Sequence, residues 1–231
     1  MGNQEQVFLH GAVLTDRGAI PDGIVVARQG RIVYVGPHRP DQMPPDAERI
    51  DAGGGYISPG FVDLHVHGGA GSDFMDATRA EVDEVFRYHA AHGTTALCPT
   101  TATAPLTEIL AALEALESYR SEPRWGRALG AHIEGPYLAM SKRGCHLPEY
   151  VRHPEPAEWR QILDRGPIAS MTLAPELEGA RELIEELHRR GARASAGHSE
   201  ALYHELETAV DWGVTHVTHL YCAMTDAMNN R

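Results

Sequence analysis

The sequence predicts an α/β fold: a (β/α) barrel of the TIM type, preceded by a small β domain. Three observations support this prediction. Apolar strand patterns alternate with helical patterns from residue 61 onward, which is typical of a parallel sheet. Each strand is followed by a polar or metal-binding residue type, as at the catalytic face of such barrels. No G-x-G-x-x-G follows the first of these strands, which disfavours the alternative, an open doubly wound sheet.

The N-terminal part is predicted to be all β. Short strand patterns at 7–9, 23–27 and 31–35 are separated by glycine and proline turns. A sheet of this size needs a second surface to cover its apolar face. We therefore assign residues 1–52 to the N-terminal part of a small β-sandwich-like domain and residues 53–231 to the barrel.

The barrel part is predicted to contain about six of the eight strands that a TIM barrel has, so the barrel is expected to be truncated on its C-terminal side. Thr78-x-x-Glu81 is a capping box that opens a helix, and Ser199 is predicted to cap a later one. The predicted strands lie in Phe61–Ala70 and at 94–99, 129–134, 168–174, 192–197 and 215–220. The predicted helices are 78–92, 106–119, 155–164, 177–190 and 199–212.

Metal-ligand residue types gather at the carboxyl ends of these strands. His65 and His67 are two residues apart in a strand, so their side chains point the same way. Other strands end at a glutamate or a histidine, and these ends share one face of a barrel. The predicted metal site consists of His65, His67, Glu134, His198 and His219. Nitrogen and oxygen donors of this kind suit Zn, Fe, Mn or Co better than Ca, and one or two ions are expected.

The alternative is that these histidines are helix caps or solvated loop residues. An isolated H-x-H is a short motif and favours that interpretation, but all five residues fall at predicted strand ends. His132 lies two residues before Glu134 and is expected to support the site or the strand. Seven other histidines are assigned solvated or packing roles, namely His10, His38, His89, His92, His153, His188 and His204.

Composition excludes several classes of protein. The net charge of −12 argues against nucleic-acid binding. No run of 18 apolar residues is present, so no membrane segment is expected, and the N-terminus lacks the pattern of a signal peptide. The cysteines Cys98, Cys145 and Cys222 are widely spaced, which suits a reducing compartment and predicts a cytoplasmic protein.

Four stretches together carry a family resemblance: P-G-F-V-D-L-H-V-H-G at 59–68, G-A-H-I-E-G-P-Y at 130–137, S-A-G-H-S at 195–199 and V-T-H-L-Y-C-A-M at 217–224. They resemble the N-acetylglucosamine-6-phosphate deacetylase family of the amidohydrolase superfamily. The resemblance implies hydrolysis of the N-acetyl group of N-acetylglucosamine 6-phosphate to give glucosamine 6-phosphate and acetate. It implies that Glu134, His198 and His219 hold the catalytic metal, with His65 and His67 for a second ion.

The resemblance also implies the residues that meet a small amino sugar phosphate. They are Cys145, His146, Cys222, Ala223 and Arg231. Cys222 stands where the family usually has asparagine, which puts phosphate recognition in question. The family's general base is an aspartate on the eighth strand and would lie beyond Arg231, so no catalytic residue is assigned. A homodimer is expected for the full-length protein.

The only lysine, Lys142, lies in a predicted loop, whereas the predicted fourth strand has none. A carboxylated lysine, the metal bridge in some relatives of this superfamily, is therefore not expected, and Glu134 would supply the bridging carboxylate. Ser199 is a weak candidate nucleophile because no G-x-S-x-G is present. Two other functions stay open: hydrolysis of a different amide, and a metal-binding but inactive fragment.

Overall fold

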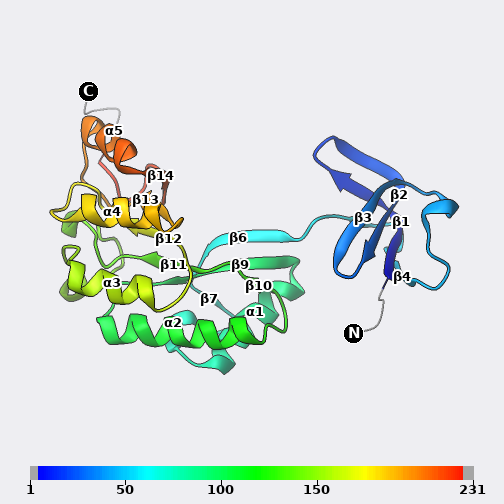
Figure 1. Cartoon of the computed structure of the whole chain (residues 1–231), viewed down its shortest axis with the longest axis horizontal. Helices are drawn as coiled ribbons and strands as arrows, with labels where there is room; N and C mark the ends of the chain where they lie inside the picture. The colour runs from blue at the N-terminus through cyan, green and yellow to red at the C-terminus, as the bar shows by residue number, and fades with distance from the viewer. Residues whose placement is uncertain (1–4, 226–231) are drawn as a thin grey trace. The chain divides into compact units, whose positions relative to one another are not determined.

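The structure is a computed structural model that describes residues 5–225 (Figure 1). The chain divides into two compact units, Met1–Gly60 and Phe61–Arg231. The division lies eight residues after the boundary expected at residue 52. Among the described residues no helix is long and apolar enough to cross a membrane.

The first unit is a five-stranded mixed sheet. Its order is β3-β2-β1-β4, with β5 also paired to β1. Strands β1, β2 and β3 are antiparallel neighbours, whereas β4 and β5 run parallel to β1. Val7, Leu9, Ile24 and Val26 form its buried cluster. The strands are β1 (Glu5–Thr15), β2 (Gly18–Arg28), β3 (Arg31–Pro37), β4 (Glu48–Asp51) and β5 (Tyr56–Ile57), with a 3-10 turn at Pro40–Gln42.

The second unit contains a parallel sheet that forms part of a TIM barrel. Its strand order is β6-β9-β11-β12-β13-β14, and every neighbouring pair is parallel. Six parallel strand positions confirm the predicted incomplete barrel. The strands are β6 (Phe61–Val66), β9 (Thr94–Thr101), β11 (Ala131–Glu134), β12 (Ile168–Leu173), β13 (Arg193–Ala196) and β14 (Val214–Val217), with β10 (Arg127–Ala128) beside β9 and a small hairpin of β7 (Gly68–Gly69) and β8 (Ser72–Asp73).

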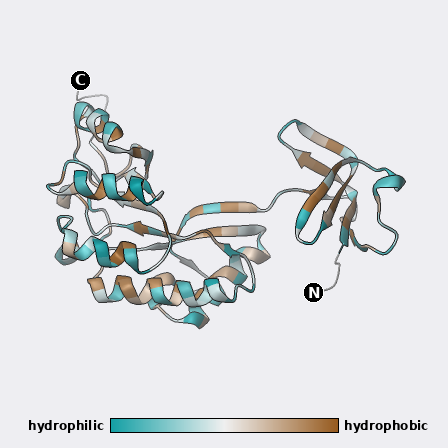
Figure 2. Ribbon diagram, in the orientation of Figure 1, coloured by the Kyte–Doolittle hydropathy of each residue, from teal (hydrophilic) through white to brown (hydrophobic). Residues whose placement is uncertain are grey.

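Helices connect these strands and cover one face of the sheet. Figure 2 shows apolar and polar residues alternating along α2 and α4, as expected for helices with one buried face. The ring of Phe86 in α1 stacks on that of Tyr119 in α2, with 4.0 Å between the ring centroids. Trp159 of α3 is fully buried. The helices are α1 (Arg79–Ala91), α2 (Leu106–Ser121), α3 (Pro156–Asp164), α4 (Ala180–Arg189) and α5 (Tyr203–Trp212), with 3-10 turns at Phe74–Asp76, Met140–Lys142 and Pro148–Tyr150.

Two predicted helix starts are wrong. The helix expected from residue 177 begins at Ala180, because Gly179 has φ of 85° and breaks the helical path. The helix expected to be capped by Ser199 begins at Tyr203, after Leu202. The Ser199 hydroxyl instead donates to Glu176 Oε2 at 2.7 Å. By contrast, Thr78 caps α1 as predicted, and its hydroxyl accepts from the Glu81 N–H.

Candidate metal centre

Glu134 is the centre of the candidate site. It is the last residue of β11, and only 2% of it is exposed. The chain then turns at Gly135, which has φ of 77°, a conformation that favours glycine. A Cβ at Gly135 would lie 2.1 Å from Thr103 Oγ1. Glycine is therefore required there for two reasons, the turn and the close approach of Thr103, which follows β9.

Five imidazole rings surround this carboxylate. His67 Nε2 lies 3.0 Å and His65 Nε2 3.4 Å from Glu134 Oε2. On the other oxygen, His219 Nε2 lies 2.9 Å and His198 Nε2 3.4 Å from Oε1. His146 Nε2 is 3.7 Å from Oε2. All five residues predicted as metal ligands are thus brought together, and His146 joins them.

The two histidines of the first strand converge as their spacing predicted. Their Nε2 atoms lie 3.1 Å apart. Thr100 of β9 fixes the strand between them, because its hydroxyl accepts from the Val66 N–H at 2.9 Å and donates to Cys98 O. Two imidazoles whose Nε2 atoms point at one spot beside a carboxylate form a ligand arrangement for a cation.

His198 provides the clearest test of whether the site fits a metal. Its Nδ1–H donates to Lys142 O at 2.8 Å, so in the neutral ring the lone pair is on Nε2. Within the described part of the chain that Nε2 is buried and has no hydrogen-bond partner. A buried, unsatisfied nitrogen is costly in a protein interior. A metal ion bound beside Glu134 would satisfy it, so the residues present fit a divalent metal.

The histidines also control the charge of Glu134. Burial alone would raise the pKa of this carboxyl. The neighbouring imidazoles of His198, His65 and His67 outweigh burial and hold the pKa of Glu134 well below its ordinary value. Glu134 is therefore an ionised carboxylate at neutral pH, which is the form that binds a cation.

His146 differs from the other rings in its tautomer. Its Nδ1 accepts from the backbone N–H of Thr103 at 3.3 Å. Burial lowers the pKa of His146, so the ring is neutral and its proton is on Nε2. The possible ligand atoms of His146, Glu134 and His198 lie close enough together to hold one ion, and so do those of His65, Glu134 and His219. The tautomer nevertheless makes His146 a hydrogen-bond donor into the site.

A chain of buried side chains crosses the sheet beneath the site. His132 Nε2, Thr172 Oγ1, Thr218 Oγ1 and Ser195 Oγ follow one another at 2.7 Å steps. His132 is in β11, Thr172 in β12 and Ser195 in β13, and Thr218 directly follows β14. The His132 ring packs edge-on against His65, with 4.6 Å between ring centroids. Burial lowers the pKa of His132 to about 4, so it is a neutral supporting residue, consistent with its predicted role.

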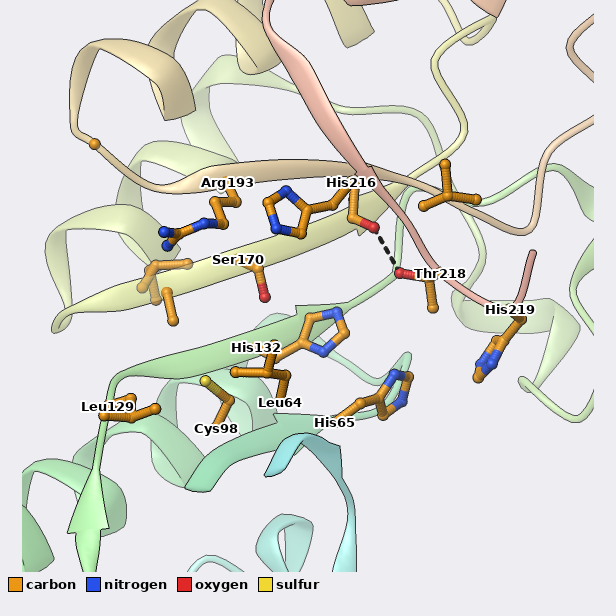
Figure 3. A pocket seen from close by; sticks show the side chains of 15 residues that line it. Leu64, His65, Cys98, Leu129, His132, Ser170, Arg193, His216, Thr218 and His219 are labelled. Atoms are coloured by element: carbon orange, nitrogen blue, oxygen red, sulfur yellow. Dashed lines mark hydrogen bonds between the residues drawn. The ribbon is translucent and has the colours of Figure 1, made fainter. Parts of the chain in front are cut away.

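A cavity of about 680 Å³ opens on the inner face of the parallel sheet (Figure 3). His65, His132 and His219 line it at the carboxyl ends of the strands, and Leu129 and Arg193 line it at the other end. In the part of the chain that the structure describes, no helix residue lines it. The inner face of the half-barrel is therefore open, and one end of its cavity is the candidate metal centre.

The predicted substrate residues lie on loops beside the centre. Cys145 and Cys222 are exposed free thiols. Ala223 O accepts from the Ser199 N–H at 3.1 Å, next to His198. Arg231, also predicted to contact substrate, lies outside the described residues. Sequence reasoning missed Thr103 and Glu176, because their partners are distant in sequence.

Comparison with known proteins gives one family. The model of the amidohydrolase family matches residues 56–229. N-acetylglucosamine-6-phosphate deacetylase of Mus musculus is 38% identical over 184 residues, which are 77% of this chain and 45% of that protein. N-acetylgalactosamine-6-phosphate deacetylase of Escherichia coli O157:H7 is 35% identical over 217 residues, 92% of this chain and 55% of that protein.

Solved structures agree with these relatives. A variant of N-acetyl-D-glucosamine-6-phosphate deacetylase from Mycobacterium smegmatis, in complex with N-acetyl-D-glucosamine-6-phosphate, matches with a TM-score of 0.83 and 34% identity over 97% of this chain and 57% of that one. The N-acetylglucosamine-6-phosphate deacetylase of Pasteurella multocida matches with a TM-score of 0.89 and 28% identity, over 98% and 59%. The chain spans about half the length of the curated relatives it matches.

Proposed function

Because the chain belongs to the amidohydrolase family, we propose that it forms the metal-binding part of a deacetylase acting on an N-acetylated hexosamine 6-phosphate. The first substrate to test is N-acetylglucosamine 6-phosphate, which would give glucosamine 6-phosphate and acetate. One observation carries the proposal. The buried, ionised Glu134 has imidazole Nε2 atoms around both of its oxygens.

The residues that would hold the metal are His65, His67, Glu134, His198 and His219. The chemistry of the donors is that of Zn, Fe, Mn or Co sites. When bound, such an ion supplies Lewis-acid polarisation of an amide carbonyl and acidifies a water molecule. His198 is prepared for ligation by its Nδ1–H bond to Lys142 O, which fixes both the tautomer and the ring orientation.

His146 is proposed to bind the acetamide oxygen of the substrate. Its Nε2–H points at the space beside Glu134, because Thr103 N–H occupies Nδ1. A fixed donor at this position stabilises the negative charge that develops on the carbonyl oxygen during attack. His146 is 7% exposed, so water screens this interaction little.

The loop containing Cys222 and Ala223 is proposed to contact the sugar phosphate. It follows the ligand His219 directly, and Cys222 N–H donates to His219 O at 2.6 Å. A loop so close to a ligand lies within reach of a substrate bound at the metal centre. Cys222 offers a thiol where a carboxamide would offer two donors and an acceptor, so the loop is expected to recognise phosphate through its backbone.

N-acetylgalactosamine 6-phosphate is the second candidate substrate. The relative from Escherichia coli O157:H7 is named for that sugar and covers 92% of this chain at 35% identity. The two sugars differ only in the configuration of one hydroxyl, so the same acetamide and phosphate contacts would serve both.

The test is acetate release by the full-length protein after loading with each of the four metals. We expect higher kcat/KM for the two 6-phosphates than for the unphosphorylated N-acetyl sugars. His146→Asn, which puts a carboxamide in place of the imidazole donor, is expected to lower kcat by about 100-fold. Absence of acetate from either phosphorylated sugar, in protein with bound metal, would leave the deacetylase proposal without support.

A further inference from the structure

Strand β12, like β9, does not lead to a predicted metal ligand, whereas β6, β11, β13 and β14 each do. The chain leaves β12 through Ala174 and Pro175 to Glu176. The carboxylate of Glu176 accepts two hydrogen bonds, from Ser199 Oγ at 2.7 Å and from Glu200 N–H at 2.5 Å.

These two bonds hold the turn that follows β13. The turn consists of His198, Ser199 and Glu200, and His198 has φ of 50°. A non-glycine residue in this conformation is strained and persists only where its surroundings fix it. Ser199 is 3% exposed. Its hydroxyl donates to Glu176 and accepts from the Ala201 N–H at 3.0 Å, so its geometry is fully determined.

The same turn holds the loop that follows His219. Ser199 N–H donates to Ala223 O at 3.1 Å, and Thr225 N–H donates to Ser199 O at 3.2 Å. Ser199 and Met224 thereby form a parallel bridge. Both segments joined by this bridge depend on the position of Ser199, and Glu176 fixes that position from the end of β12.

The loop itself is strained. His219, Tyr221 and Ala223 have φ of 53°, 71° and 50°, and none of them is glycine. Each such residue is less stable than a relaxed backbone, so the loop needs external contacts to keep its form. The two bonds to Ser199 supply such contacts at Ala223 and Thr225, and His219 Nε2 contacts Glu134 Oε1 at 2.9 Å at the start of the loop.

We propose that Glu176 is a positioning residue that holds the loop 219–225 in its substrate-binding form. It acts through Ser199 and does not itself touch the substrate. The inference rests on the proposed function, since it assumes that this loop meets the sugar phosphate. The metal ligands keep their own supports, because Lys142 O holds His198 and Glu134 faces His219.

Glu176→Gln is the test variant. Glutamine has one acceptor oxygen, so it cannot accept from both Ser199 and Glu200 in the same way. Glu178→Gln is the matched control, since Glu178 is an exposed acid two residues away with no hydrogen bond or ion pair among the described residues. Hydrogen exchange, metal content and kinetics are measured on the full chain of each variant and of the unmodified protein.

In Glu176→Gln we expect the amides of Ser199 and Thr225 to exchange at least about tenfold faster, because a charge-assisted bond that holds them is lost. KM for the phosphorylated N-acetyl sugar is expected to rise about tenfold with kcat within about threefold, the pattern of lost binding and not of lost chemistry. Metal content should stay at the level of the unmodified protein. Glu178→Gln should match the unmodified protein in all three measurements.

Equal exchange and equal KM in the two variants would overturn the proposal, as would a loss of metal in Glu176→Gln. If that variant does not unfold cooperatively, Ser199→Ala removes the same side-chain bond from the other partner, and unchanged exchange at Thr225 would then overturn it. If the unmodified protein releases no acetate, the proposed function fails, while the exchange measurement still decides whether Glu176 orders the loop.

Discussion

In the described structure, the Nδ1 of His198 is hydrogen-bonded, whereas its Nε2 is buried and has no hydrogen-bond partner. Such a ring is held ready for a metal before the metal arrives. Replacing it by alanine removes both the proposed ligand atom and the hydrogen bond to Lys142 O.

His198→Ala is therefore expected to weaken Zn²⁺ binding by at least about 100-fold, since even supporting residues of metal sites account for 10- to 100-fold. Competition with a chelating dye measures the affinity. His204→Ala is the control, because His204 is exposed on α5 and should leave the affinity unchanged. Equal affinities in the two variants would remove His198 from the site.

Thr172 is the central link of the buried chain under the metal centre. Its hydroxyl contacts both His132 and Thr218, and Thr172 is fully buried. Valine has a similar shape but leaves two buried polar groups each without this partner.

Thr172→Val is expected to lower the free energy of unfolding by about 1–3 kcal/mol, measured by urea denaturation. Thr208→Val, at an exposed position of α5, should change it by less than about 0.5 kcal/mol. A neutral result for Thr172→Val would mean that the chain of buried hydroxyls contributes nothing to stability.

The cluster of residues around Glu134 could be predicted one residue at a time, because each lies at or just after the end of a strand and strand ends share a face in this fold. Roles that depend on pairs of residues could not. Thr103 sets the tautomer of His146 from 43 residues away, and Glu176 holds Ser199 from 23 residues away. Nothing in the local pattern of either residue indicates its partner.

At the scale of the element, the turn after β11 depends on Gly135. Its φ of 77° disfavours any side chain, and a Cβ there would lie only 2.1 Å from Thr103 Oγ1. Gly191, at the start of the path into β13, has a similar φ of 75° but open space around it. A comparison of alanine substitutions at the two glycines therefore separates the cost of backbone strain from the cost of steric overlap.

Gly191→Ala is expected to cost about 1–2 kcal/mol from the left-handed backbone alone. Gly135→Ala should cost that amount and about 1–3 kcal/mol more from overpacking, and it should also disturb Glu134. Urea denaturation of both variants measures the difference. Equal losses of stability would show that Thr103 yields without cost to a side chain at residue 135.

Element boundaries were predicted well where a local signal exists. Thr78 caps α1, and glycines follow the ends of α1 and α4, as the sequence indicates. Ser199 has the residue type of a helix cap, but α5 begins at Tyr203. Its hydroxyl is taken by Glu176, so a tertiary contact overrides the local preference.

At the scale of the molecule, the described strands leave β6 and β14 as the edges of the parallel sheet. Val62 and Leu64 on β6 are 58% and 57% exposed, and Val217 on β14 is 49% exposed. Edge strands with apolar surface associate with other chains. The resemblance to the deacetylases and the partial barrel are both confirmed by the relatives and solved structures, whereas the homodimer stays a prediction.

The 231-residue chain taken alone is therefore expected to self-associate and to bind the dye ANS at micromolar concentration. Light scattering coupled to size-exclusion chromatography measures the association. The double variant Val62→Lys with Val217→Lys should associate less, because charges on an edge block strand pairing. A monomer that binds no dye would contradict the exposed inner face.

Elemental analysis decides whether Glu134 and the histidines around it form a metal site. Folded protein is freed of metal with a chelator, dialysed against Zn²⁺ or Mn²⁺ and then against metal-free buffer. We expect about one tightly bound ion or more per chain, and nearly none in Glu134→Gln, which loses the central ligand. Less than about half an equivalent in the unmodified, folded protein, or full occupancy in Glu134→Gln, would contradict the metal site.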